Sequence, residues 1–285
     1  MTLQSFMAQP SIKDVRTLFL DNLANQNVSF TGKQGSGCTP LLIHQNLSTS
    51  YYPTKLLEYL IKGNQTIVIS GSQGSGKTSL MMSLIEQLDP KLRISTLPEN
   101  SVYIQKLYPT RNVVPFQGTY SSSTLENLDV KYKSDYPVSI FDEIANQEST
   151  FLNHYFNSLF SIFTHYGKEL SDIVGSLRNS FIQKGLCDNE KNAEQLIVNL
   201  LDFNIHIVRN EDGSRYIERI TECVPLESKG NRLYEARNIV ELREGKYVPL
   251  NPISTSRQEV IMHALSDEDK VEFREFTKLY WVDEN

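Results

Sequence analysis

The glycine-rich stretch GSQGSGKT, at residues 71–78, constrains the fold of this chain more than any other segment. Its spacing satisfies G-x-x-x-x-G-K-[ST], the pattern of a phosphate-binding loop. The continuous apolar run TIVIS at residues 66–70 precedes it and predicts a buried parallel strand. The run LMMSLIEQL at residues 80–88 follows it with helical spacing of its apolar residues. A strand, a glycine loop and a helix in this order predict an α/β domain that binds phosphate.

Each residue type in this loop suits a nucleotide and its Mg²⁺. Glycines let the backbone turn tightly, so that successive N–H groups point at phosphate oxygens. Lys77 offers an ammonium group to the β- and γ-phosphates, and the hydroxyl of Thr78 offers a ligand for Mg²⁺. We therefore expect ATP and Mg²⁺ as cofactors. The predicted nucleotide-binding residues are Gly71, Ser72, Gln73, Gly74, Ser75, Gly76, Lys77, Thr78 and Ser79.

A second glycine-rich stretch, TGKQGSGCTP at residues 31–40, nearly repeats the first but has Cys38 where the lysine belongs. A neutral thiol cannot replace a cation between two phosphate groups. The segment LLIHQNLSTSYYP that follows is too short and too soon broken for the helix of a phosphate loop. We interpret residues 31–40 as a glycine-rich hairpin turn without a catalytic role, and we expect a single phosphate site. Internal duplication and chance both remain as origins of the repeat.

Acidic residues follow another buried strand, in PVSIFDE at residues 137–143. Asp142 at the strand end can hold Mg²⁺ through its water shell, and Glu143 beside it can polarise the attacking water. The next predicted strand, SIFTH at residues 161–165, ends in His165, and a polar side chain at such a tip can sense the terminal phosphate. The structural alternatives are a pair of helix-capping acids and a histidine with no catalytic role.

Strand and helix patterns alternate along the chain as far as about residue 200. This alternation predicts βαβ units and a mainly parallel sheet. The chain then changes to two hairpins, around NEDG at residues 210–213 and REGK at residues 243–246, and a helical end. The other predicted helices cover residues 11–24, 53–63, 122–132, 151–159, 169–184 and 256–280, and the other strands cover residues 92–97, 112–116, 203–208 and 215–221.

Composition and charge are those of a soluble globular protein. The formal net charge is −6, so no global basic field favours nucleic acid or anionic lipid. Three cysteines lie far apart without a CxxC pair, which suits a reducing cytosol rather than a disulfide framework or a zinc site. No apolar run reaches the ~20 residues of a membrane-spanning helix, and the N-terminus lacks the pattern of a secretory signal. We expect the protein in the cytoplasm.

In the order of its motifs the chain resembles the hexameric secretion ATPases of type II, type IV, Tad-pilus and conjugation systems, over residues 51–226. LRISTLPEN at residues 92–100 resembles the acidic box of that family. FDEIANQES at residues 141–149 resembles its second Walker motif. FSIFTHYGKELSDIVGSL at residues 160–177 resembles its histidine box, and residues 202–224 resemble its closing hairpin.

The resemblance implies a RecA-like core with a mainly parallel sheet and the additional strand of the catalytic-glutamate class of ATPases, followed by C-terminal hairpins and helices. The catalytic residues that it implies are Lys77, Glu99, Glu143 and His165. Candidates to stabilise developing phosphate charge, from the same or an adjacent subunit, are Arg93, Arg111 and Arg178.

The resemblance also implies an ATP-driven ring, a hexamer, that passes force to a membrane-embedded translocation complex. The protein would then be peripheral at the inner face of the cell membrane. The corresponding division of the chain is a short N-terminal segment at residues 1–50, an ATPase core at residues 51–230 and a hairpin and helical region at residues 231–285.

Two alternatives stand beside this motor. One is a DNA-translocating or packaging ATPase on the same core, for which the acidic balance and the lack of an aromatic-plus-basic strand give little support. The other is a nucleotide-dependent scaffold with weak hydrolysis. It is favoured by three departures from the family pattern: Pro98 at the first acidic position, Ala145 in place of an arginine, and Tyr166 rather than His165 in the strict register of the histidine box.

Overall fold

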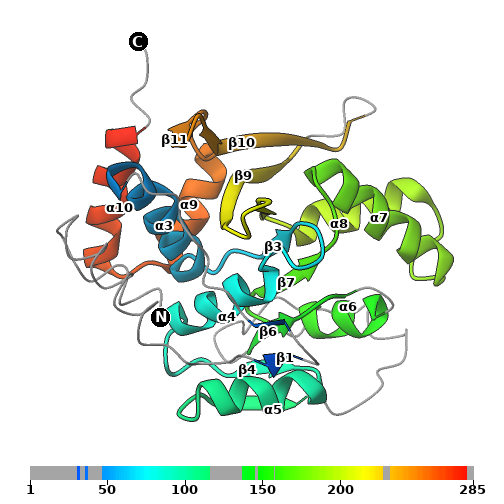
Figure 1. Ribbon diagram of the computed structural model, residues 1–285. Helices are drawn as coiled ribbons and strands as arrows, with labels where there is room; N and C mark the ends of the chain where they lie inside the picture. The colour runs from blue at the N-terminus through cyan, green and yellow to red at the C-terminus, as the bar shows by residue number, and fades with distance from the viewer. Residues whose placement is uncertain are drawn as a thin grey trace.

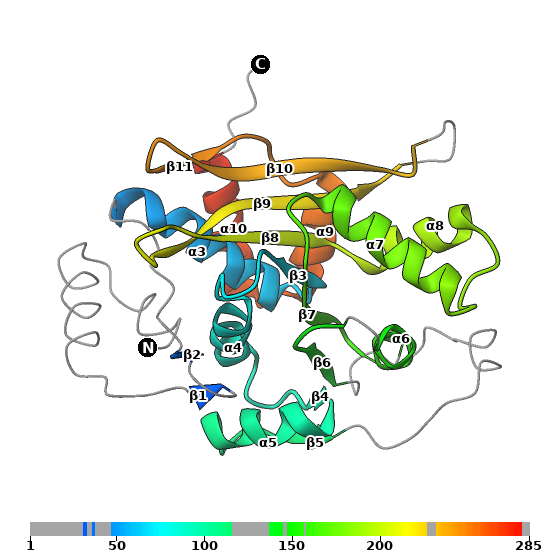
Figure 2. The same ribbon diagram turned by 45° about the vertical axis from the view of Figure 1, so that its right-hand side comes forward.

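The computed structural model describes residues 31–32, 36–37, 47–115, 137–144, 147–156, 158–226 and 232–280. Two predicted helices, at residues 11–24 and 122–132, lie outside the described residues, as do Cys38 and Ala145. The described residues form a nine-stranded sheet with helices on both faces (Figures 1 and 2). The chain is therefore an α/β protein, as the alternating pattern predicts. No helix in the described ranges is long and apolar enough to cross a membrane.

The strands of this sheet are β3 (Ile67–Ser70), β4 (Ile94–Thr96), β5 (Val113–Pro115), β6 (Val138–Phe141), β7 (Ser161–His165), β8 (Phe203–Arg209), β9 (Arg215–Pro225), β10 (Tyr234–Arg243) and β11 (Lys246–Pro249). They lie in the order β11-β10-β9-β8-β3-β7-β6-β4-β5. Pairing is parallel from β5 to β8 and antiparallel from β8 to β11. Strand β7 thus lies between β3 and β6, although it follows β6 in the chain.

The described helices are α3 (Leu47–Lys62), α4 (Lys77–Gln87), α5 (Pro98–Leu107), α6 (Glu148–Phe156), α7 (Leu170–Gln183), α8 (Glu190–Leu200), α9 (Thr255–Ala264) and α10 (Asp267–Tyr280). Figure 2 shows α3, α4, α9 and α10 on one side of the sheet and α6, α7 and α8 on the other. Helix α5 lies beside β4 and β5 at one end of the sheet (Figure 2).

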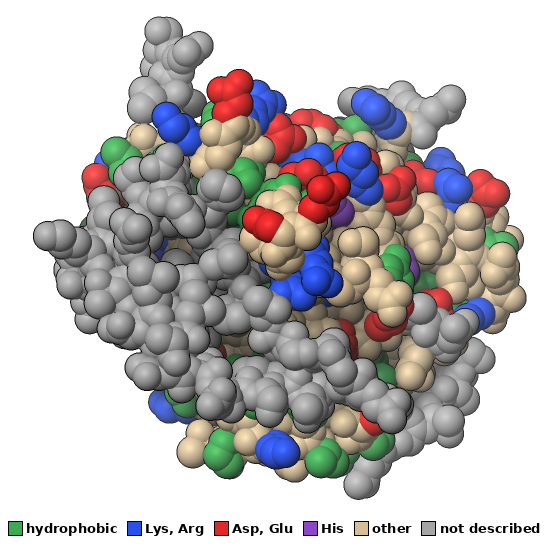
Figure 3. All heavy atoms as spheres, viewed as in Figure 1, with side chains coloured by type: hydrophobic (Ala, Val, Ile, Leu, Met, Phe, Trp, Pro, Cys, Tyr) green, Lys and Arg blue, Asp and Glu red, His purple; other side chains and the backbone are tan. Residues whose placement is uncertain are grey.

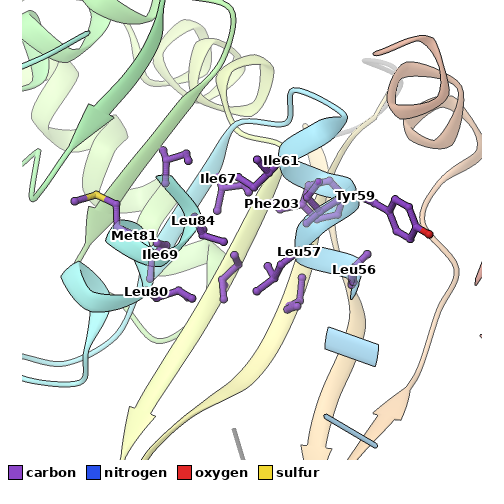
Figure 4. Packing of buried hydrophobic residues seen from close by; sticks show 14 of the residues in the cluster. Leu56, Leu57, Tyr59, Ile61, Ile67, Ile69, Leu80, Met81, Leu84 and Phe203 are labelled. Carbon is purple, nitrogen blue, oxygen red and sulfur yellow. The ribbon is translucent and has the colours of Figure 1, made fainter. Parts of the chain in front are cut away.

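The apolar run before the glycine loop is buried on both sides, which explains why it does not alternate with polar residues. Ile67 and Ile69 pack into the cluster that α3, α4 and the C-terminal helices complete, whereas Val68 packs into the cluster of α6, α7 and α8. Figure 4 shows side chains of α3, α4, β3 and β8 converging in the first cluster. The strand that carries the loop is therefore held firmly from both faces.

Several elements differ from those that the local patterns predict. No helix is predicted directly after the strand at residues 92–97, but α5 begins there at Pro98. Proline suits the first position of a helix, because its missing N–H has no partner there in any case. Helix α8 is not among the predicted helices. Asn189 is its N-cap and accepts the N–H of Asn192 at 2.9 Å, and asparagine before a helix is a sequence signal that could have revealed it. The predicted C-terminal helix is two helices, because Ser266 caps the second one by accepting the N–H of Asp269 at 3.1 Å.

The second glycine-rich stretch, at residues 31–40, contains two short strands, β1 (Thr31–Gly32) and β2 (Ser36–Gly37). They pair antiparallel, with Thr31 opposite Gly37 and Gly32 opposite Ser36. The predicted hairpin at this stretch is confirmed.

Candidate functional site

The glycine loop joins the end of β3 to the first turn of α4. Gly71, Gly74 and Gly76 have φ angles of +150°, +74° and +102°, which side chains with a Cβ rarely adopt. A Cβ on Gly71 would also lie 2.4 Å from the carbonyl oxygen of Ile207 in β8. The glycines are therefore needed both for the backbone path and for the close approach of β8.

Lys77 is the first residue of α4, and its ammonium group is folded back onto the loop. It donates hydrogen bonds of 3.0 Å to the carbonyl oxygens of Gly71 and Ser72. Its Nζ also lies 4.3 Å from the centre of the Tyr166 ring. Burial lowers the pKa of Lys77, while the nearby carboxylates of Glu143 and Asp142 act in the opposite direction. The cation thus occupies the centre of the loop and faces the acidic strand ends.

The hydroxyl of Thr78 joins the loop to the carboxyl end of β6. It lies 2.9 Å from each oxygen of the Asp142 carboxylate. From the tip of β7, the hydroxyl of Thr164 donates to Asp142 at 3.1 Å and accepts the N–H of Glu143 at 2.8 Å. Parallel pairing brings these strand ends to one edge of the sheet, so the three segments meet although they are distant in sequence.

This set of donors fits Mg²⁺. Mg²⁺ prefers oxygen ligands and is usually bound by one or two protein groups together with phosphate oxygens and waters. Thr78 and Asp142 supply a hydroxyl and a carboxylate at one point. Within the described ranges, no group of three or more His, Cys, Asp or Glu side chains could hold a metal ion by itself. The residues present therefore suit a metal that arrives with a nucleotide.

Glu143 sits beside the loop in an uncommon backbone conformation, with a φ of +64°. Burial raises the pKa of the Tyr166 phenol, and the negative charge of the nearby Glu143 carboxylate raises it further. The side chain of Tyr166 is 43% exposed. Tyr166 thus contacts Lys77 through its ring and lies close enough to the predicted catalytic glutamate for their charges to interact.

His165 precedes Tyr166 but belongs to the other face of β7. Its Nε2 lies 3.1 Å from the hydroxyl of Ser176 in α7, and the side chain is buried. Burial lowers the pKa of His165, so the neutral ring is favoured. Of these two neighbours, the structure brings Tyr166 against Lys77 and Glu143 and places His165 against α7.

Glu99 is exposed in the first turn of α5. That helix follows β4, which β7 and β6 separate from the loop-bearing β3. Strand β4 pairs directly with β6, which leads to Asp142. Among the described residues, no hydrogen bond or ion pair joins Glu99 to Lys77, Thr78 or Asp142.

The three arginines considered from the sequence occupy other places. Arg111 donates to the carbonyl oxygens of Glu86, Leu88 and Asp89 at the end of α4. Arg178 in α7 pairs with Glu194 in α8 at 3.1 Å. Arg93 is exposed just before β4.

A different arginine contacts the loop. The Nε of Arg215, the first residue of β9, donates to the carbonyl oxygen of Gly74 at 3.1 Å. The two residues are 141 positions apart, and the sequence pattern around Arg215 indicates only a strand. Figure 3 shows the face of the molecule that is turned to the viewer in Figure 1. Basic and acidic side chains gather near the middle of that face, in the region of β3 and β9.

The fold of the described residues has likenesses among solved structures. No model of a known family matches the chain, and no curated protein matches it in sequence. Among solved structures, the chain is similar to the VirB11 ATPase of the Brucella suis type IV secretion system, in a crystal structure with sulphate, at 17% identity and a TM-score of 0.46. The likeness covers 76% of this chain and 64% of that one, so the chain matches less than two thirds of the length of this relative.

Proposed function

We propose that the protein is an ATP-hydrolysing motor of the secretion, pilus or conjugation type, with a RecA-like core. The observation that supports it best is the contact of Thr78 with Asp142, with Glu143 alongside. It joins a lysine-bearing phosphate loop to a pair of acidic residues at the end of β6, and β7 between β3 and β6 supplies a polar tip. The motor assignment itself rests on the family resemblance of the motifs.

The residues of the site divide the chemistry among them. On nucleotide binding, Lys77 would exchange its two carbonyl partners for phosphate oxygens. When bound, Mg²⁺ neutralises charge on the phosphate oxygens, and Thr78 and Asp142 would hold it. Glu143 would accept a proton from water as the water oxygen bonds to the γ-phosphorus and the bond to ADP breaks, giving ADP and phosphate.

As a motor, the protein would work as a homo-oligomeric ring, a hexamer, at the cytoplasmic face of the membrane. Closure of each subunit on ATP, and opening on release, would move a membrane-embedded secretion complex. The cargo of such a motor would be pilin, protein or DNA.

A nucleotide-dependent scaffold is the second candidate, and the position of Glu99 favours it. Because Pro98 starts a helix here, Glu99 lies exposed in the first turn of α5, and among the described residues it makes no hydrogen bond or ion pair with the loop. A motor that needs an acid at this position would then hydrolyse ATP slowly or only with a partner.

The first experiment is ATP turnover by the purified protein, together with its mass in solution with and without a non-hydrolysable ATP analogue. We expect turnover and rings that depend on the nucleotide. Tight binding without turnover would favour the scaffold, and turnover stimulated by DNA, with binding that weakens steeply as salt rises, would favour the DNA translocase.

Two variants locate the activity. Lys77→Ala is expected to abolish nucleotide binding, and Glu143→Gln to retain binding and stop turnover. Lys106→Ala removes an exposed lysine of α5 and serves as the matched control, with Cys38→Ala as a control for the second glycine stretch. Normal nucleotide affinity in Lys77→Ala would overturn the site.

A further inference from the structure

Two arginines face each other across the start of the β8–β9 hairpin. Arg209 is the last residue of β8, and Arg215, the first residue of β9, is its direct partner in the ladder. The turn between them is tightly built, since the N–H of Asn210 donates to the carbonyl oxygen of Ser214 at 2.8 Å and the N–H of Ser214 donates to Asp212 at 2.8 Å. The hairpin therefore presents both arginines from a rigid base.

Arg215 lies under the glycine loop. Only 7% of this residue is exposed, and its Nε donates to the carbonyl oxygen of Gly74. A Cβ on Gly76 would lie 2.8 Å from the Cδ of Arg215, so the stem of the arginine packs against the bare face of that glycine. These contacts fix the position of the loop relative to the hairpin.

Arg209 reaches the same loop and is exposed to solvent. Its Nη1 lies 3.5 Å from the position of a Cβ on Gly74, and its Nη2 lies 3.8 Å from that of a Cβ on Gly213. The guanidinium group therefore lies over the loop tip, where Ser72, Gln73 and Gly74 are also exposed. In the described part of the chain, Arg209 takes part in no ion pair with a carboxylate.

The electrostatic arrangement favours an anion at this point. Like charges placed directly opposite in an antiparallel pair repel each other. Arg209 and Arg215 are opposite each other, and both lie against a loop whose backbone turns resemble those that bind phosphate. A polyphosphate in the loop would relieve the repulsion and accept hydrogen bonds from a planar guanidinium.

We propose that Arg209 contacts the polyphosphate of the bound nucleotide in cis, and that Arg215 is a positioning residue that holds the loop for it. This inference rests on the proposed nucleotide site. The phosphate-contacting arginine would then come from the β8–β9 hairpin of the same subunit. It would replace the candidates from the sequence, which are Arg93, Arg111 and Arg178.

The test compares Arg209→Ala and Arg209→Lys with Arg243→Ala. Arg243 is a matched control because it also ends a strand at a hairpin turn, and its side chain is 56% exposed. Titration with ADP and with a non-hydrolysable ATP analogue, each with Mg²⁺, gives the affinities. We expect about a tenfold loss in Arg209→Ala, a smaller loss in Arg209→Lys and no change in Arg243→Ala. Wild-type affinity in Arg209→Ala would overturn the role of Arg209.

Pyrophosphate separates a phosphate contact from a contact with the base or ribose. In competition with a fluorescent nucleotide, pyrophosphate should also bind more weakly to Arg209→Ala than to the wild type. An unchanged pyrophosphate affinity beside a lower ATP affinity would overturn the contact with phosphate. Failure of the wild type to bind any nucleotide would instead overturn the proposed function, so the two failures are distinguishable.

Arg215→Lys tests the positioning role, because lysine keeps the stem and the charge but loses the Nε donor. We expect weaker nucleotide binding at an unchanged midpoint of thermal unfolding. Wild-type nucleotide affinity in Arg215→Lys would overturn the positioning role. If Arg215 were purely structural, Arg215→Lys would lower the midpoint of thermal unfolding together with the nucleotide affinity, and that result would also overturn it.

Discussion

Lys77 makes hydrogen bonds to its own loop, and this shapes how it can bind a ligand. Its two carbonyl partners and the face of Tyr166 hold the ammonium group in place. Burial lowers the pKa of Lys77, so an incoming phosphate would stabilise the charged form. The position of this cation is prepared before a ligand arrives, and binding exchanges partners rather than ordering a free side chain.

At the same scale, Tyr166 offers the sharpest test of how Glu143 is oriented. Tyr166→Phe keeps the ring over Lys77 and removes the phenol hydroxyl that interacts with Glu143. We expect kcat for ATP hydrolysis to fall about three- to tenfold with nucleotide affinity unchanged, because the glutamate loses an orienting partner. Steady-state kinetics and titration measure the two effects. Tyr216→Phe on β9 is the control, and wild-type turnover in Tyr166→Phe would contradict the prediction.

Strands β3 and β8 are coupled through a buried polar contact next to the loop. Ser70 and His206 are partners in the parallel ladder, and the Ser70 hydroxyl lies 3.0 Å from Nδ1 of His206. On its other side, Nε2 of His206 lies 3.7 Å from a carboxylate oxygen of Glu218 in β9. Burial, followed by the positive charge of Arg219, lowers the pKa of His206 to about 4. The ring is therefore neutral at pH 7.

The low pKa of His206 predicts that the folded protein loses stability in acid. The pKa of an unfolded histidine is about 6.5, so between that value and about 4 the unfolded chain binds more protons than the folded chain. The stability that His206 contributes is present above this window and is lost as the pH falls through it. From pH 7 to pH 5 we expect a contribution of about 2 kcal/mol to the loss in free energy of unfolding.

Urea unfolding at the two pH values measures this effect. His206→Gln should lose less stability between pH 7 and pH 5 than the wild type, because glutamine does not titrate. An identical pH dependence in both proteins would show that His206 is not the group responsible.

At the scale of the whole molecule, the C-terminal helices complete the core around the loop-bearing strand. Tyr52 of α3 stacks on Phe276 of α10, with ring centres 5.3 Å apart. Both residues belong to the cluster that contains Ile67 and Ile69 of β3. Residues beyond 231 thus share buried surface with the phosphate-loop strand.

An ion pair adds a second link between the end of the chain and the same strand. Asp202, just before β8, accepts the N–H of Thr66 at 2.7 Å and pairs with Arg257 of α9 at 2.5 Å. Both side chains are 15% exposed. These contacts connect α9 to the starts of β3 and β8, at the opposite end of the strands from the loop.

The shared core predicts that α10 matters for global stability. Phe276 is 5% exposed and packs among aromatic rings, so Phe276→Ala is expected to lower the free energy of unfolding by about 3 kcal/mol. Leu279 lies on the same helix but is 70% exposed. Leu279→Ala should therefore change the free energy of unfolding by less than about 0.5 kcal/mol. Denaturant unfolding measures both variants. Equal effects of the two substitutions would contradict the packing of α10.

The sequence by itself determined the elements whose information is local. Residues 138–141 and 161–165 form strands with the predicted bounds, and each is short and buried along its whole length. The glycine loop is equally local, since the three glycines, Lys77 and Thr78 are adjacent in the chain and their roles depend on their spacing. Both C-terminal hairpins were likewise predicted from their turn residues.

Only the tertiary structure decided which distant side chains join that loop. Alternation along β7 sends His165 towards α7 and leaves Tyr166 beside Lys77, and a local pattern cannot tell which face of the strand meets the site. Sheet order places β8 next to β3, and this brings Arg209 and Arg215 to the loop. The physical reason is that spacing encodes contacts within a few residues, whereas contacts across the sheet depend on which strands pair and which faces become buried.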